Sequence, residues 1–198
     1  MTWALISRRL LSVALVLSLT IGLWQTGEGL WIYAKARLAQ LLLERAWTRA
    51  VAGEWESKPW PWADTWPIAR LKNSRLGIDL IVLAHAGGEA LAFGPAQVSG
   101  AAMPGVNGTV ILTGHRDTHF AFLRKLRHDD LLRLEMADGR TVHYVVREAT
   151  VMDSRTGAIA SDDRPRLALI TCYPFDAITP GGPWRFVVMA ETSPRTHD

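Results

Sequence analysis

The hydrophobic residues of this chain follow one pattern before residue 53 and another after residue 68. Residues 10–24 form an uncharged apolar run, and Leu38, Leu41 and Leu42 lie on one face of a helix predicted to extend from residue 30. Gly53 is a residue type that can end this helix. Beyond residue 68 the apolar runs are short and separated by turns, and no long amphipathic helix is predicted. The chain is therefore expected to combine a helical N-terminal part with a β-rich part.

Short apolar and β-branched runs predict six strands in the β-rich part. Two of these runs flank residues 137–140, Ala-Asp-Gly-Arg, and an Asp-Gly turn in this setting is a hairpin signal. Several short strands at this spacing are typical of an all-β barrel or sandwich. The predicted strands are residues 78–83, 108–113, 131–136, 141–147, 166–171 and 184–190.

A segment rich in tryptophan and proline, residues 54–67, joins the two parts. Three prolines within nine residues exclude a regular helix, and four indoles seldom stay exposed together. We interpret the segment as a strap packed on the β domain; an interface belt and a ligand platform are the alternatives. A chain that begins near Glu54 is then expected to be soluble without detergent. The predicted division is a membrane anchor (1–29), a stalk helix (30–53), the strap (54–67), the β domain (68–191) and a polar tail (192–198).

The apolar run at residues 10–24 indicates export. A full span needs about 20 residues, so the run crosses a bilayer only if neighbouring residues lie in the headgroup zones. Arg8 and Arg9 precede it, which predicts a cytoplasmic N-terminus, a single pass through the inner membrane and an extracytoplasmic β domain. Two alternatives stay open: a signal peptide cleaved after Ala34-Lys35-Ala36, and a twin-arginine signal at residues 7–11. All three imply the same compartment.

Composition excludes several classes of protein. The 198 residues include 22 Lys and Arg against 19 Asp and Glu, a net charge of only +3, and the basic residues are scattered rather than clustered, so no nucleic-acid partner is expected. A single cysteine excludes an internal disulfide framework and a cysteine-rich zinc ribbon. There is no glycine-rich phosphate loop, and no cofactor is expected.

That single cysteine, Cys172, ends the predicted strand 166–171 and is followed by a loop. An unpaired thiol is a liability in an exported protein because it can form intermolecular disulfides, so a reactive role is favoured over a structural one. A thiol with a pKa of about 8.5 needs a basic or cationic neighbour to react near neutral pH. His115 follows another strand end and mirrors the setting of Cys172, and Arg185 would lie beside Cys172 if the last two predicted strands pair. Four other histidines lie in turns, on a strand or in the tail: His85, His128, His143 and His197.

Three segments, in order, carry a resemblance to a known family: Thr113-Gly114-His115, Leu169-Ile170-Thr171-Cys172 and Arg185-Phe186-Val187-Val188. They resemble the T-G-H, T-L-x-T-C and R-[LFI]-[VI]-V signatures of the sortases, with typical spacing, and the resemblance covers about residues 60–190. Ala168 departs from the signature, where Thr is usual. The segments 115–120 and 171–187 further resemble the sortases of marine and other Gram-negative proteobacteria.

The resemblance implies a membrane-anchored cysteine transpeptidase on a closed eight-stranded β-barrel with short helices, preceded by a transmembrane helix and a stalk helix. Such enzymes cut a C-terminal LPxTG-like sorting motif of an exported protein and transfer the acyl group to an amine acceptor. By motif, Cys172 is the nucleophile, His115 the acid and base, and Arg185 the group that stabilises the oxyanion, with Arg116 as the alternative. Thr171 is assigned to substrate binding. Some sortases bind calcium through acidic loops, but no matching acidic cluster occurs here, and no metal is expected.

Other readings of the same residues remain. In papain-like peptidases the cysteine precedes the histidine, whereas here His115 precedes Cys172; the caspase order fits, but the caspase signature around the cysteine is absent. A cysteine hydrolase without transfer is one alternative, and a non-enzymatic, membrane-tethered binding domain is another. A metal site formed by His115 and His119 is a third, although the segment begins at a strand exit rather than in a helix.

Overall fold

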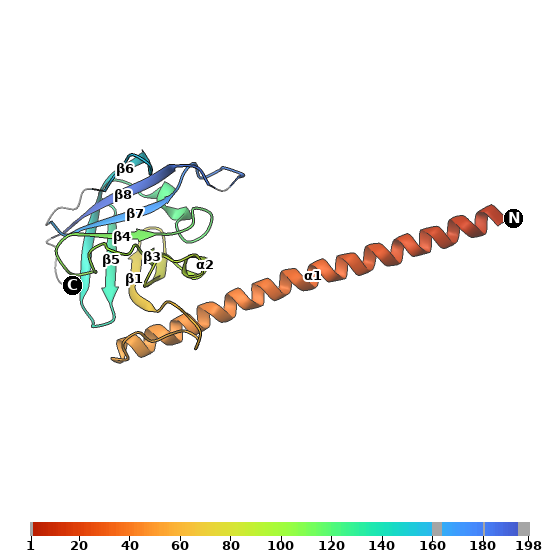
Figure 1. Ribbon diagram of the computed structural model, residues 1–198, viewed down its shortest axis with the longest axis horizontal. Helices are drawn as coiled ribbons and strands as arrows, with labels where there is room; N and C mark the ends of the chain where they lie inside the picture. Colours follow the sequence, from red (N-terminus) through yellow and green to blue (C-terminus); the bar gives the residue numbers. More distant parts are fainter. Residues whose placement is uncertain (1, 160–163, 180, 194–198) are drawn as a thin grey trace. The chain divides into compact units, whose positions relative to one another are not determined.

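A computed structural model describes residues 2–159, 164–179 and 181–193 (Figure 1). The chain divides into two compact units, Met1–Leu41 and Leu42–Asp198. The predicted tail 192–198 is described only at Thr192 and Ser193, so His197 lies outside the described residues.

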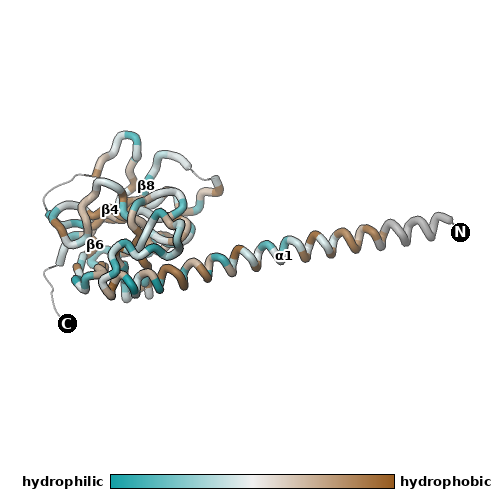
Figure 2. The backbone as a smooth tube through the Cα atoms, turned by 60° about the horizontal axis from the view of Figure 1, so that its bottom comes forward, coloured by the Kyte–Doolittle hydropathy of each residue, from teal (hydrophilic) through white to brown (hydrophobic). Residues whose placement is uncertain are grey.

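The first unit consists of most of helix α1 (Thr2–Val51). The boundary predicted at residue 29 is not a break, because the helix continues through Gly27 and Gly29. From Val13 onward the helix is long and apolar enough to cross a membrane, judged by length and composition alone, and Figure 2 marks its apolar residues in brown. The Thr26 hydroxyl donates to the Gly22 carbonyl at 2.7 Å, which satisfies this polar group within the helix.

Gly53 stops the helix, as its residue type predicted. Its φ of 97° lies in the left-handed region, which glycine adopts without steric cost. Its N–H donates to the Ala50 carbonyl at 3.0 Å, and the Glu54 N–H donates to the Arg49 carbonyl at 3.0 Å. These bonds pair carbonyls that the last helical turn would otherwise leave free.

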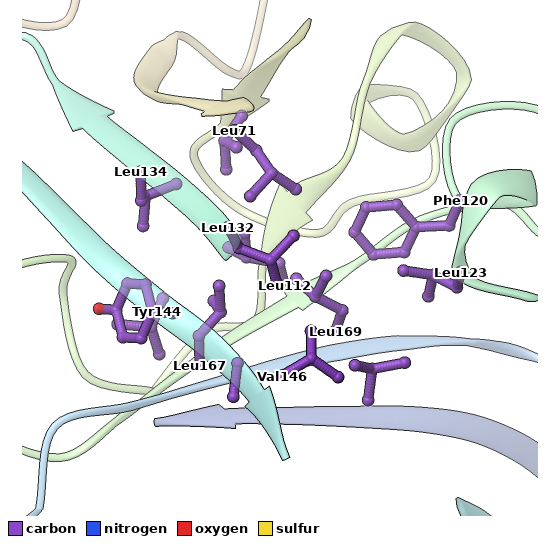
Figure 3. Close-up of a cluster of buried hydrophobic side chains, with 14 of the residues drawn as sticks. Leu71, Leu112, Phe120, Leu123, Leu132, Leu134, Tyr144, Val146, Leu167 and Leu169 are labelled. Carbon is purple, nitrogen blue, oxygen red and sulfur yellow. The ribbon is translucent and has the colours of Figure 1, made fainter. Parts of the chain in front are cut away.

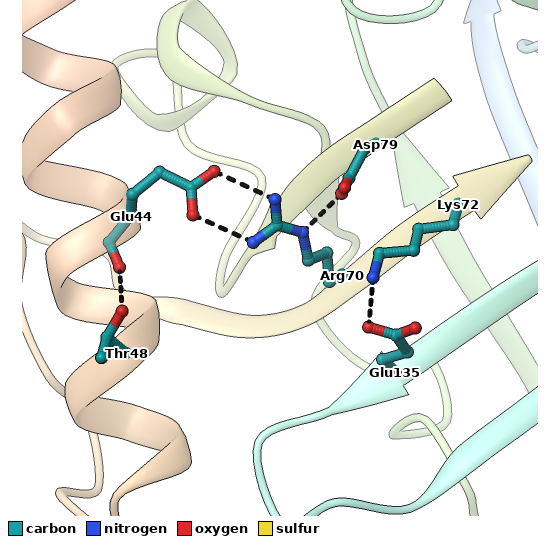
Figure 4. A network of polar contacts seen from close by, with 6 residues as sticks. All are labelled: Glu44, Thr48, Arg70, Lys72, Asp79 and Glu135. Carbon is teal, nitrogen blue, oxygen red and sulfur yellow. Dashed lines mark hydrogen bonds and ion pairs between the residues drawn. The ribbon is translucent and has the colours of Figure 1, made fainter. Parts of the chain in front are cut away.

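The last turns of α1 belong to the second unit. Leu43 and Trp47 are buried in one apolar cluster with Ile81 and Leu83. In the same turns, the Glu44 carboxylate accepts two hydrogen bonds from the Arg70 guanidinium, at 2.9 and 3.2 Å (Figure 4). Arg70 also pairs with Asp79. The predicted stalk is therefore in part a packed element of the β domain.

Eight strands close into a barrel in the order β1-β2-β3-β4-β7-β8-β6-β5. All neighbours are antiparallel except two parallel pairs, β2 with β3 and β4 with β7. Two short helices, α2 (Ala90–Phe93) and η1 (Ala121–Lys125), lie between strands in the sequence. The strands are β1 (Pro67–Asn73), β2 (Ile78–Leu83), β3 (Ala96–Gln97), β4 (Thr109–Thr113), β5 (Leu131–Met136), β6 (Thr141–Asp153), β7 (Arg166–Cys172) and β8 (Trp184–Thr192).

Alternate residues of the strands fill the barrel (Figure 3). Leu167 and Leu169 of β7, Leu132 and Leu134 of β5, and Tyr144 of β6 are all buried in one cluster. Burial raises the pKa of the Tyr144 hydroxyl to about 12, because the phenolate would lose its hydration. Because strand side chains alternate, Ala168 and Ile170, which separate Leu167, Leu169 and Thr171 in the sequence, face away from the barrel interior.

The predicted closed eight-stranded barrel is confirmed, and two predicted strands, β2 and β5, have the expected bounds. β6 runs to Asp153, six residues beyond the prediction, because its second half pairs with β8 from Glu148 to Asp153. β1 is absent from the predicted strands, because charged residues occupy two of its three half-buried positions, Arg70 and Lys72. Lys72 pairs with Glu135 of β5 at 2.7 Å (Figure 4).

The predicted packing of the strap holds for two of its four tryptophans. Trp60 meets Phe93 edge-on at a centroid distance of 4.9 Å, and Trp66 meets His85 at 5.2 Å. Trp55 and Trp62 are 88% and 81% exposed, so the prediction is wrong for them.

These contacts change the expected N-terminal limit of the folded domain. A chain that begins at Leu42 is expected to fold and to resist urea, whereas one that begins at Glu54 loses Leu43 and Trp47 and exposes their partners. Removing one large buried side chain costs about 2–5 kcal/mol, so the shorter chain should unfold at a clearly lower urea concentration or precipitate. Val51→Ala in the longer chain removes an exposed side chain and serves as the control. Equal urea midpoints for the two chains would contradict this packing.

Candidate active site

Three neighbouring strands bring the predicted site residues to one end of the barrel. β4 and β7 run parallel, with Val110 opposite Leu167 and Thr113 opposite Ile170, so both strands end at the same edge. Continued by two residues, this register places His115 level with Cys172. β8 runs antiparallel to β7 and therefore begins at the edge where β7 ends.

Arg185 lies directly across from Cys172 in the β7–β8 ladder. The next pair, Tyr173 and Trp184, is joined by a hydrogen bond of 3.0 Å from the Tyr173 N–H to the Trp184 carbonyl. Hydrogen-bonded and non-hydrogen-bonded pairs alternate in an antiparallel ladder, so Cys172 and Arg185 form a non-hydrogen-bonded pair, for which the Cα separation is typically about 4.5 Å. The predicted pairing of the last two strands, with Arg185 beside the cysteine, is thus confirmed.

Cys172 is a free, half-buried thiol on the outer face of the barrel. Leu169 and Thr171 are buried on the opposite face of the same strand, so alternation turns the Cys172 side chain away from the core. Arg185, its cross-strand partner, shares that outer face. A thiol in this position is supported by a rigid ladder and is still reached by solvent.

Thr171 links the cysteine strand to the histidine turn. Its hydroxyl, 1% exposed, donates to the Gly114 carbonyl at 2.7 Å, and the Gly114 N–H donates to the Ile170 carbonyl at 3.2 Å. These bonds extend the β4–β7 pairing past the end of β4 and hold the backbone next to His115. The predicted contact of Thr171 with a substrate stays a prediction.

Gly114 is required at its position by packing. A Cβ built there would lie 2.9 Å from Cγ of Phe120, whose ring is fully buried in the core. The Phe120 N–H in turn donates to the His115 carbonyl at 3.0 Å, which closes the turn 115–120 over that ring. The side chain of His115 projects from this turn and is exposed.

His119 lies in the same turn and is close enough to His115 for their charges to repel. Burial is the main cause that lowers its pKa, repulsion by His115 lowers it further, and a hydrogen bond with the main chain of Ala92 in α2 partly opposes both. His119 is half-buried, and His115 is the imidazole of this turn that is exposed to solvent. The sequence pointed to His119 only as a metal ligand, because its burial depends on α2, which is distant in the chain.

The Arg185 guanidinium is engaged with its own loop in this structure. Its Nη1 donates to the carbonyls of Gly182, at 2.7 Å, and Trp184, at 2.9 Å. Of the remaining predicted candidates, His85 and His128 are exposed, and His128 pairs with Asp129 at 3.0 Å. Among the described residues, no three side chains of His, Cys, Asp or Glu group as metal ligands.

A thiol, an imidazole and a guanidinium at adjoining strand ends form a recognisable chemical set. A thiol can attack a carbonyl carbon, an imidazole can donate or accept the proton of an amine, and a guanidinium can bind a developing oxyanion. The arrangement is suited to acyl transfer through a thioester.

Comparisons with known proteins agree with this arrangement. The family model of the sortase domain matches residues 71–193. Sortase D of Bacillus subtilis (strain 168) is 34% identical over 86 residues, which cover 43% of this chain and 43% of that protein. The chain thus matches less than half the length of this relative.

Solved structures of sortases share the fold. The Clostridium perfringens sortase D5 transpeptidase has a TM-score of 0.63 at 20% identity, over 79% of this chain and 99% of the other. Sortase C-1 from Actinomyces oris has a TM-score of 0.58 at 26% identity, over 65% and 75% of the two chains. Sortase A from Corynebacterium diphtheriae has a TM-score of 0.59 at 23% identity, over 68% and 66%.

The barrel and its strand-end thiol define a protein of the sortase class. The chain belongs to the sortase family, since the family model covers more than half of its residues, including Cys172, His115 and Arg185.

The close contact between Gly114 and Phe120 predicts that adding a single methyl group at residue 114 lowers the stability of the protein. Gly114→Ala must displace the Phe120 ring or the turn, so it should lower the free energy of unfolding by about 1–3 kcal/mol, the usual cost of overpacking. Gly88→Ala is the control, because a Cβ there meets nothing within 4 Å. Urea unfolding measures both variants, and equal stability of the two would show that the turn is not packed as described.

Proposed function

We propose that this protein is a membrane-anchored cysteine transpeptidase that acts on exported proteins. The observation that carries the proposal is the strand register, in which Cys172 faces Arg185 and is level with His115, within a chain that belongs to the sortase family. The long apolar part of α1 supports anchoring in the inner membrane with the N-terminus in the cytoplasm, since Arg8 and Arg9 precede the apolar run.

Acyl transfer follows from the roles of the three groups. The Cys172 sulfur, as thiolate, attacks the carbonyl carbon of the scissile peptide bond, and the resulting oxyanion is stabilised by the Arg185 guanidinium. The intermediate collapses, the C–N bond breaks, and His115 donates a proton to the departing amine, which leaves a thioester on Cys172. The nitrogen of an incoming neutral amine then attacks the thioester carbon and loses a proton to His115 as the N–C bond forms; the C–S bond breaks, which releases the product amide and the Cys172 thiolate.

To bind the oxyanion, the Arg185 guanidinium can turn from the Gly182 carbonyl toward the carbonyl group that Cys172 attacks. The Gly182 carbonyl lies in an exposed part of the loop, where water can replace the guanidinium at little cost. We expect the step that forms the oxyanion to involve a change of rotamer at Arg185, with the β7–β8 ladder unchanged.

The substrate proposed is a C-terminal LPxTG-like sorting motif, cut between Thr and Gly. This rests on the resemblance of the three motifs to the family signatures, as does the finer similarity of segments 115–120 and 171–187 to the sortases of Gram-negative proteobacteria. The acyl acceptor is proposed to be an amine.

Cys172→Ala and His115→Ala are expected to abolish cleavage of an LPxTG peptide while the barrel stays folded, because both side chains are on the surface side of the site. Loss of a nucleophile or of a general acid lowers rates by about 10²-fold or more. His128→Ala, which alters another exposed histidine, is the matched control. Near-normal turnover in either site variant would overturn the assignment.

Product analysis by mass spectrometry in the same assay separates transfer from hydrolysis. With a glycine-based amine present, the wild-type protein should release mainly the amide adduct. Free acid as the sole product, at all amine concentrations, would instead identify a cysteine hydrolase.

Arg185→Lys keeps the positive charge and removes the planar fork that can hold an oxyanion by two hydrogen bonds. We expect kcat/KM to fall by about 10–100-fold, within the range seen when one oxyanion donor is weakened. Circular dichroism and urea unfolding should be unchanged, since the Arg185 side chain is bound to the main-chain carbonyls of Gly182 and Trp184, at an exposed end of the sheet. An unchanged rate would mean that another group binds the oxyanion.

A further inference from the structure

Arg116, the residue directly after His115, has an unusual environment for a charged side chain. Its guanidinium is only 6% exposed, although it sits in a turn beside an exposed histidine. Burying a charge is costly unless its hydrogen bonds are satisfied. The hydrogen-bond partners of Arg116 therefore need to be identified.

Most of the partners of Arg116 come from the loop between β7 and β8. Its Nη2 donates to the carbonyls of Ala177 at 2.8 Å and Thr179 at 3.3 Å. Its Nε lies 3.4 Å from the carboxylate of Asp117, which is 69% exposed and therefore contributes little. Its Nη1 is buried and has no hydrogen-bond partner among the described residues.

This set of contacts is poor for stability. A buried guanidinium with an unpaired donor forfeits hydration that the remaining bonds do not fully replace, and apolar residues of similar size are often equal or better in such places. The hydrogen bonds of Arg116 are therefore of interest for the segments that they connect, the His115 turn and the β7–β8 loop, rather than for their net contribution to stability.

The loop that Arg116 holds is the one that borders the thiol. It begins at Tyr173, next to Cys172, and leads to Arg185, so we expect a peptide attached to the sulfur to lie beside it. Arg185 binds the end of the loop, at Gly182, while Arg116 binds its middle. The Arg116 side chain thereby connects the His115 turn to the middle of this loop.

We propose that Arg116 is a positioning residue that clamps the β7–β8 loop to the His115 turn and so shapes the substrate groove beside Cys172. The proposal rests on the proposed function for its kinetic consequence, but the clamp itself is a property of the loop. Removing the clamp should weaken peptide binding more than it slows the chemical steps, because Cys172, His115 and Arg185 are held by the strand register and not by Arg116.

The test compares Arg116→Met with Arg124→Met in the full chain in detergent. Arg124 is an exposed arginine in η1, so its replacement removes the same charge from a neighbouring segment. Three quantities are measured: hydrogen exchange of the amides of residues 176–179, the melting temperature, and kcat and KM for an LPxTG peptide.

For Arg116→Met we expect faster exchange in residues 176–179, a melting temperature equal to or above that of the wild type, and a KM raised about tenfold with kcat within about threefold, which is the effect of one lost charge-assisted interaction. Arg116→Lys should restore part of the peptide affinity, because an ammonium can still donate to one loop carbonyl. Alkylation of Cys172 by iodoacetamide should proceed at the wild-type rate in every variant.

Two results would overturn the clamp. Unchanged exchange in residues 176–179 would show that the loop does not depend on Arg116, and a large drop in melting temperature with equal losses of kcat and kcat/KM would show a merely structural role. If the wild-type protein cleaves no peptide, the proposed function fails, while the exchange measurement still decides whether Arg116 holds the loop.

Discussion

The parallel pairing of β4 with β7, extended by the bond from Thr171 to Gly114, is the interaction on which the site depends. Without it, the two strand ends that carry His115 and Cys172 would be joined only through distant parts of the barrel. A buried hydrogen bond contributes about 1 kcal/mol net, and an unpaired buried carbonyl costs about 1–3 kcal/mol, so this contact strongly favours a single register. A slip of one residue in β7 would turn the thiol into the core.

Two arginine side chains in the second unit connect segments that are distant in the sequence. Arg70 joins the last turns of α1 to β1 and β2, and Arg116 joins the histidine turn to the loop after the cysteine. The two guanidinium groups differ in how their hydrogen bonds are satisfied. Arg70 has carboxylate partners and is partly exposed, whereas Arg116 is almost fully buried and relies on main-chain carbonyls. The first arrangement is typical of structural support, and the second is found where position matters more than stability.

Local sequence signals predicted a large part of this fold. Alternating or continuous apolar runs located six of the eight strands, and Gly53 marked the end of the helix, because these signals depend on neighbouring residues only. The two strands that were missed depend on distant partners: β1 carries charges neutralised across the sheet, and β3 has only two residues. Packing of Leu43 and Trp47 on β2, and the exposure of Trp55 and Trp62, also follow from tertiary contacts that no local pattern contains.

The candidate site could be predicted as a set of residues, but only in part as an arrangement. His115 and Cys172 were predicted from their positions after strand ends, and Arg185 from its position at the start of a strand. The registers of β4 with β7 and of β7 with β8 bring the three residues to one end of the barrel. The burial of Arg116 and His119 had no local signal, since it is produced by the β7–β8 loop and by α2.

Trapping the covalent intermediate tests the central claim most directly. The protein is mixed with an LPxTG peptide, quenched in acid within milliseconds to seconds, digested and examined by mass spectrometry. A peptide acyl group attached to Cys172 as a thioester, lost on addition of hydroxylamine or an amine, is the result we predict. Cleavage of the peptide with no adduct at Cys172, or with an adduct at another residue, would contradict the account.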